Sequence, residues 1–249
     1  MNETITIAPQ EKEIFIAREL VGKYIRRCQE AIRLAVELDR GKVTKEVMSV
    51  PGMSAAKNRL MINRLVGHED TKYLEVGTHV GAMFCAALHG NNPAYACGID
   101  NFSQFEFGPD GEERLDATKQ LEAMFKENCK KHIDCNFDFF NRDCFDLTKT
   151  QKDKLRKQRI NTYLYDGPHS QVDHIRAITD YLEFLDNVFI VVIDDWNIPE
   201  VRNGTFKALK SQNVKVWWQI NLEADIANRD IRNWWNGVWV AVCEKRNKD

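Results

Sequence analysis

The stretch Tyr73-Leu-Glu-Val-Gly-Thr-His-Val-Gly81 decides the fold class, because it joins a strand pattern to a glycine turn. Tyr73 to Val76 is predicted to be a short strand, and Val80 to His89 is predicted to be a helix. The glycines between them allow the backbone to turn sharply and to approach a ligand closely. Such a turn also occurs in purely structural strand–helix joints, so the motif needs support from the rest of the chain.

That support comes from alternating strand and helix patterns downstream. Val188 to Ile193 is an uninterrupted apolar run, as expected of a central strand buried on both faces. The predicted strands cover 94–99, 136–140, 162–165 and 188–193, the predicted helices 113–132, 171–184 and 200–211, and the two final strands 214–220 and 237–244. Repeated units of this kind predict an α/β fold with a mostly parallel sheet, helices on both faces and an antiparallel C-terminal hairpin on one edge.

The first part of the chain has a different pattern. From Glu11 to Arg40, apolar residues recur at helical spacing, which predicts one long helix or two short ones. Ser54 could cap a helix that runs to about Leu65. The sequence therefore predicts an N-terminal helical extension over 1–50 and one α/β domain over 51–249.

Composition excludes several classes of protein. The 35 basic and 37 acidic residues give a net charge of −2, which offers no reason to expect a nucleic acid partner. No apolar run is long enough for a bilayer, and the start lacks a signal-peptide pattern. Seven cysteines occur without a Cys-x-x-Cys pair, which fits reduced thiols and disfavours a structural zinc site. We expect a cytoplasmic protein without a membrane partner.

Two aspartates follow the second and third predicted strands. Asp100 could accept hydrogen bonds from both hydroxyls of a ribose, although capping of a helix or loop explains it equally well. Asp143 could accept a hydrogen bond from an adenine amino group, although a loop aspartate is more often a turn residue. Ligands of open α/β sheets bind beyond the carboxyl ends of the strands, where both residues are predicted to lie.

Three further aspartates follow the fourth and fifth strands, which should be neighbours. Asp166, Asp194 and Asp195 would then meet at one rim of the sheet and repel one another unless a positive charge holds them. Oxygen ligands suit a hard cation such as Mg²⁺. The alternative is that one or two of them cap the next helices. His169 lies beside this group and could take a proton from a substrate hydroxyl, whereas a purely structural role is the alternative.

At this point the chain resembles the class I S-adenosylmethionine (SAM)-dependent methyltransferases, and within them most nearly the macrocin-type and other sugar O-methyltransferases. The resemblance covers about Met53 to Glu244. It is carried by the sequences Leu74-Glu-Val-Gly-Thr-His-Val-Gly81, Gly98-Ile-Asp100, Tyr165-Asp-Gly-Pro-His-Ser170 and Ile193-Asp-Asp-Trp196. It implies a Rossmann-like, seven-stranded sheet with the last strand antiparallel.

The resemblance also implies roles for individual residues. The metal ligands would be Asp166, Asp194 and Asp195, and His169 would be the general base, with Asp166 also catalytic. The remaining positions would contact SAM, namely Glu75, Gly77, Thr78 and Gly81 at its methionine part, Asp100 at the ribose, Asn101 and Asp143 at the adenine, and Asp166. Two departures stand out, Ala82 in place of a frequent serine and Pro168 in place of a polar residue.

The sequence thus predicts a SAM-dependent O-methyltransferase that uses Mg²⁺ or another divalent cation on a small hydroxylated substrate resembling a sugar or diol. In relatives, helices like those of residues 1–50 cover the substrate or form a dimer contact. One alternative is a non-catalytic cofactor-binding or scaffold protein on the same fold. An NAD-dependent oxidoreductase is less favoured, because Glu75 and Thr78 interrupt the Gly-x-Gly-x-x-Gly pattern.

Overall fold

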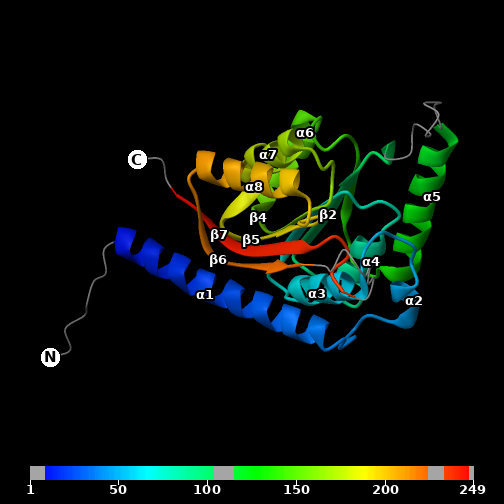
Figure 1. Cartoon of the computed structure of the whole chain (residues 1–249), viewed down its shortest axis with the longest axis horizontal. Coiled ribbons are helices and arrows are strands. Elements are labelled where there is room, and N and C mark those ends of the chain that lie inside the picture. The colour runs from blue at the N-terminus through cyan, green and yellow to red at the C-terminus, as the bar shows by residue number, and fades with distance from the viewer. Residues whose placement is uncertain (1–8, 104–114, 224–232, 247–249) are drawn as a thin grey trace.

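The computed structural model describes residues 9–103, 115–223 and 233–246. Its strands form a single seven-stranded sheet in the order β3-β2-β1-β4-β5-β7-β6 (Figure 1). The strands are β1 (Lys72–Val76), β2 (Tyr95–Asp100), β3 (Asp138–Asn141), β4 (Ile160–Tyr165), β5 (Leu185–Ile193), β6 (Val214–Leu222) and β7 (Val238–Lys245). Strand β7 is antiparallel to both of its neighbours, β5 and β6, and the other pairs are parallel. The predicted fold class is therefore confirmed.

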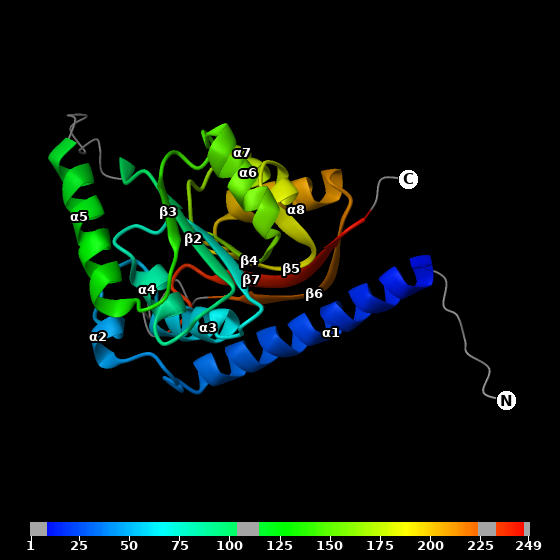
Figure 2. The same cartoon turned by 180° about the vertical axis from the view of Figure 1, so that it is seen from behind.

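Helices cover both faces of this sheet. Figures 1 and 2 show α1 and α3 on one face and α6, α7 and α8 on the other. The helices are α1 (Pro9–Val36), α2 (Lys45–Met48), α3 (Ala56–Val66), α4 (Ala82–Leu88), α5 (Leu115–His132), α6 (Lys149–Gln158), α7 (Gln171–Thr179) and α8 (Pro199–Ser211). Two apolar cores result, one on each face of the sheet. No helix within the described ranges is both long enough and apolar enough to cross a bilayer.

Helix α1 packs on the sheet through one apolar stripe. Tyr24, Cys28, Ala31 and Ala35 recur three or four residues apart and are all buried, which is the spacing of one helix face. They belong to the same core as the buried residues of α3, α4, β5 and β7. The N-terminal helix therefore contributes to the core of the sheet domain.

Several predicted boundaries differ from the structure. The helix predicted over 171–184 ends at Thr179, and a 3₁₀ turn, η2 (Leu182–Phe184), precedes β5. Tyr181 and Phe184 are buried there, so tertiary packing ends the helix early. Ser54 does not cap α3, whose N-cap is Ala55, but accepts a hydrogen bond from Arg59 Nε at 2.9 Å. Most of the loop predicted over 101–112 lies outside the described residues.

The turn after β1 brings its backbone against β4. Gly77 has φ +86°, and a Cβ placed on it would lie 1.9 Å from the carbonyl oxygen of Asp166. The amide of Asp166 donates to the carbonyl of Val76 at 2.8 Å, so the two strand ends are held together. Only glycine fits this position, because any side chain would collide with backbone.

Candidate active site

A cavity of about 660 Å³ opens at the carboxyl ends of the parallel strands. Its volume lies within the range of small-molecule sites, and its position is the one where ligands bind in open α/β sheets. Most of the site positions predicted from the sequence line this cavity. They are Gly77, Asp100, Asn101, Asp143, Asp166, His169, Asp194 and Asp195.

Three other predicted cofactor residues, Glu75, Thr78 and Gly81, are not among the residues that line the described cavity. Glu75 is fully buried and accepts a hydrogen bond from the hydroxyl of Tyr73, whereas its Oε1 has no partner within the described residues. The Oγ1 of Thr78 is likewise buried without a partner there. Burial, and to a lesser extent the charge of Asp100, raises the pKa of Glu75 to about 8, against the hydrogen bond from Tyr73. A protonated carboxyl is therefore the stable form of Glu75 at neutral pH.

This buried acid makes a testable contribution to stability. The pKa of Glu75 is higher in the folded than in the unfolded chain, so the unfolded chain loses its proton first as the pH rises above about 4.5. Stability from this group is present at low pH and is lost up to about pH 8. Glu75→Gln removes the loss. We therefore expect the free energy of unfolding of Glu75→Gln, relative to wild type, to be about 2.5 kcal/mol higher at pH 7 than at pH 5.

Urea unfolding of Glu75→Gln and wild type at the two pH values measures this difference. Glu183→Gln serves as the control, because the side chain of Glu183 is 45% exposed and pairs with Arg156 on the surface. An equal change in stability at both pH values for Glu75→Gln would contradict the titration of a buried Glu75.

The predicted ribose and adenine residues are tied into turns. Asp100 accepts the backbone N–H of His79 at 2.6 Å through Oδ2 and that of Phe102 at 2.6 Å through Oδ1. Asn101 accepts from Ser103, and Asp143 accepts the N–H of Phe145 at 2.7 Å. Asp100 and Asp143 therefore make local turn contacts, and their contacts with a ribose and an adenine stay predictions. Each carboxylate oxygen has a second lone pair, so these bonds leave room for a ligand at the same atoms.

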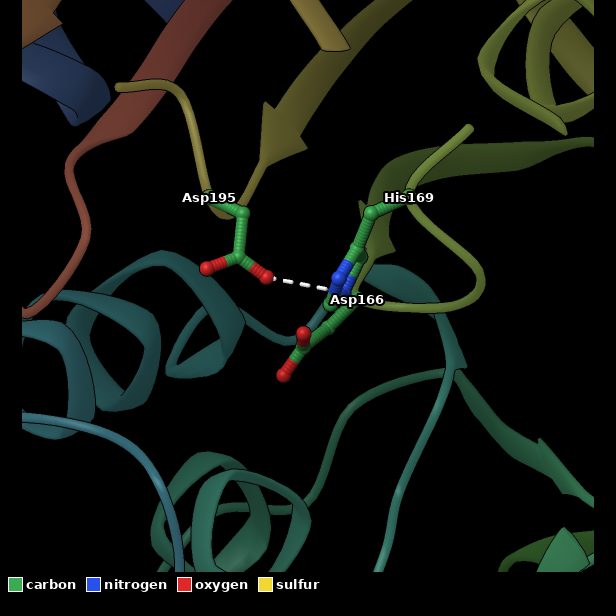
Figure 3. A group of neighbouring side chains, drawn as sticks. All are labelled: Asp166, His169 and Asp195. Carbon is green, nitrogen blue, oxygen red and sulfur yellow. Dashed lines mark ion pairs between the residues drawn. The ribbon is translucent and has the colours of Figure 1, made fainter. Parts of the chain in front are cut away.

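Asp166, His169 and Asp195 come together at the other side of the cavity (Figure 3). One ligand atom from each residue lies within 4.8 Å of those of the other two. His169 Nε2 is 2.8 Å from Asp195 Oδ2. The Oδ1 of Asp195 accepts from the side-chain amide of Asn236 at 2.7 Å.

The pKa shifts of Asp166, His169 and Asp195 have different directions and causes. Burial, followed by repulsion from Asp194 and Asp195, raises the pKa of Asp166 well above its ordinary value. Burial also opposes ionisation of Asp195, but the hydrogen bonds from His169 and Asn236 outweigh it and lower the pKa of Asp195. The bond to Asp195 raises the pKa of His169. His169 and Asp195 therefore stabilise each other's charged forms, whereas burial and the neighbouring carboxylates disfavour the charged form of Asp166.

Asp194 lies at the edge of this group. It is only 5% exposed, and its Oδ1 accepts from the Nδ2 of Asn58 in α3 at 3.4 Å. Burial and the neighbouring Asp195 raise its pKa well above the ordinary value. Asp194 lines the cavity but does not belong to the three-residue group of Figure 3. Its assignment as a metal ligand stays a prediction.

Comparison with solved structures finds several methyltransferases among the chains that are similar to this one. No family model and no curated protein matches it. CalS11, a TDP-rhamnose 3'-O-methyltransferase of calicheamicin biosynthesis, is 12% identical over 98% of this chain and 97% of its own, with a TM-score of 0.49. An O-methyltransferase from Bacillus cereus, solved with S-adenosylhomocysteine (SAH), is 10% identical over 88% and 91%, with a TM-score of 0.45.

TrmK from M. capricolum, also solved with SAH, is 11% identical over 76% of this chain and 68% of its own, with a TM-score of 0.48. The chain spans about half the length of two other solved structures that it matches, 47% and 48%. Similarity at this level of identity does not establish a shared activity.

The cavity also contains residues that the sequence patterns did not reveal. Met53, Phe145, Arg176, Trp235 and Asn236 line it, and they come from loops and from α7. A loop residue carries no periodic signal, and helical spacing does not show what Arg176 of α7 faces, so nothing in the sequence could have assigned these side chains to the cavity. For Trp196, the sequence left pocket lining and core packing open. The structure buries it in the core against Trp239, with ring centroids 5.0 Å apart.

Proposed function

We propose that this chain is a SAM-dependent O-methyltransferase that acts on a small hydroxylated substrate, resembling a sugar or a diol, with Mg²⁺ or another divalent cation. The observation that carries the proposal is the meeting of Asp166, His169 and Asp195 in the same cavity as Asp100. A base and two carboxylates beside a nucleoside-sized space suit transfer to a hydroxyl group.

The turn after β1 offers a binding surface that suits SAM. The close approach of Gly77 to Asp166 leaves backbone at the cavity surface, where a ligand can lie against it. Glu75 Oε1 and Thr78 Oγ1, from residues close to Gly77 in the sequence, are buried polar atoms without partners in the described chain. Buried polar atoms of this kind are normally satisfied, so a bound polar group accounts for them. SAM would supply an electrophilic methyl group, and Asp100, Asn101 and Asp143 would hold its nucleoside part.

The donor set also fits a divalent cation. Asp166 and Asp195 supply hard carboxylate oxygens, which Mg²⁺ prefers, and Asp194 is the third acid at the same rim. A cation there would bind adjacent substrate oxygens and lower the pKa of the attacking hydroxyl. Burial and the neighbouring carboxylates raise the pKa of Asp166 and of Asp194, and a cation at the same place would oppose both effects.

The residues of the chain would then divide the work. Asp166 and Asp195 would orient the acceptor, and His169 in its neutral form would take the hydroxyl proton at Nδ1, because its Nε2 is bonded to Asp195. The side chain of His169 is 43% exposed, so the proton can leave to solvent afterwards. Most of the rate gain would come from holding the hydroxyl and the methyl donor in line.

Calorimetric titration with SAH, with and without Mg²⁺, tests the proposal. We expect one SAH to bind per chain, and NADH not to compete. Failure of SAH to bind under both conditions, or displacement of SAH by NADH, would contradict a methyltransferase and favour a scaffold or an oxidoreductase.

A further inference from the structure

The cavity has two chemically different halves, because the strand order separates its walls. Arg142, Asp143 and Phe145 follow β3, whereas Asp195 follows β5 and Trp235 and Asn236 precede β7. Four strand spacings lie between β3 and β5, which is roughly 19 Å across the sheet. In the proposed function the β3 side holds the nucleoside, so the β5–β7 side is the acceptor half.

Trp235 has an unusual backbone in the acceptor half. Its φ is +52°, a left-handed conformation that bulky residues rarely adopt. The turn that imposes this conformation is held by its neighbours. The N–H of Gly237 donates to the carbonyl of Trp234 at 2.8 Å, and that of Asn197 donates to the carbonyl of Asn236 at 2.8 Å. Strain that the surroundings maintain in this way concentrates at ligand sites.

The same turn is bonded to the acid group and to α3. The side chain of Asn236 donates to Asp195 at 2.7 Å. On the other side, Lys57 donates to Asn233 at 2.8 Å and lies over the ring of the buried Trp234. Trp235 is therefore fixed between two anchored neighbours. It is half-buried and lines the cavity, and among the described residues no aromatic ring packs on its indole.

Charge also distinguishes the acceptor half. Asp166, Asp194 and Asp195 follow β4 and β5 in this half, and Asp173 of α7 is a further acid of the cavity lining. Met53 and Pro168 add apolar surface. The arginines among the described lining residues are at the other half. Arg142 follows β3, and Arg176 lies 4.0 Å from the ring centre of Phe145. Three carboxylates outweigh the charge of one divalent cation, and His169 is the one other group described in this half that can become positive, so an anionic acceptor would meet no excess of positive charge there.

We infer that Trp235 is the specificity-determining residue for the acceptor, and that its indole is the platform for an uncharged ring carrying two adjacent hydroxyls. This inference rests on the proposed function. The apolar face of such a ring would lie on the indole, while its hydroxyls reach the group of Asp166, His169 and Asp195. Sugars and catechols share this chemistry.

The test measures binding of catechol and of methyl α-L-rhamnoside to the SAH-loaded protein by calorimetry. Trp235→Asn removes the ring but tolerates a positive φ, so the turn is kept. We expect it to weaken ring binding at least tenfold while SAH affinity stays within about twofold. Trp235→Phe keeps an aromatic face and should stay within about threefold. Trp217→Phe is the control, because Trp217 is an exposed residue of β6 outside the cavity lining.

Anionic counterparts test the charge of the acceptor half. We expect 3,4-dihydroxybenzoate and rhamnose 1-phosphate to bind at least tenfold more weakly than catechol and the methyl rhamnoside, respectively. Binding of catechol would identify an aromatic diol as the acceptor, and binding of the methyl rhamnoside would identify a sugar.

The outcomes separate the two proposals. If SAH does not bind to the wild type, the proposed function itself is contradicted. If SAH binds, three results overturn the inference alone. They are unchanged ring binding in Trp235→Asn, no binding of either neutral ring, and binding of the anions as tight as that of the neutral rings.

Discussion

Replacing Asp195 with asparagine is expected to lower methyl transfer roughly 1000-fold, which corresponds to about 4 kcal/mol of lost transition-state stabilisation. Asp195 is central to the acceptor half, because it contacts both His169 and Asn236 and also lines the cavity. Its pKa is lowered, so it is the ionised member of the acid group. Asparagine keeps the shape and tolerates the φ of +54° at this position, so the loss is one of charge.

A binding measurement supports this prediction independently of any acceptor. Titration with Mn²⁺, followed by the EPR signal of the free ion, should show an affinity at least tenfold weaker for Asp195→Asn than for wild type. Asp186→Asn is the matched control, because Asp186 lies near the opposite end of β5 and pairs with Arg159 at 2.8 Å. Unchanged Mn²⁺ affinity in Asp195→Asn would remove Asp195 from any metal site.

Gly77→Ala is expected to destabilise the fold by about 4 kcal/mol and to abolish SAH binding. The added methyl group would sit 1.9 Å from the carbonyl oxygen of Asp166, in a backbone conformation with φ +86°. Left-handed strain and overpacking against backbone both contribute, and neither is relieved by rotating a side chain. Separation of β1 from β4 would open the turn against which the cofactor is proposed to lie.

Gly22→Ala tests whether the effect belongs to the turn. Gly22 lies inside α1, where a Cβ would meet only Arg26 Nη1 at an ordinary 3.5 Å, so alanine should stabilise the chain by up to about 1 kcal/mol. Urea unfolding of both variants gives the comparison. A Gly77→Ala protein as stable as wild type would show that the two strand ends are not in the contact described.

The sequence by itself determined the class of fold and most of the cavity rim. Strand and helix periodicities depend on local geometry, so the β-α order, the antiparallel last strand and the residues after each strand could be placed. Because parallel strands end at the same rim, the strand pattern alone is enough to expect Asp100, Asp166 and Asp195 in one cavity.

Only the tertiary structure decided which of these side chains meet and what surrounds them. Spacing along the chain could not show that His169 bonds to Asp195, that Asp194 accepts from Asn58, or that Glu75 is buried beside Tyr73. Nor could it bring Trp235 to the cavity, since that side chain arrives on a turn with no periodic signal. Strand ends are fixed by local preferences, whereas side-chain contacts and pKa shifts depend on burial and on neighbours that are remote in the sequence.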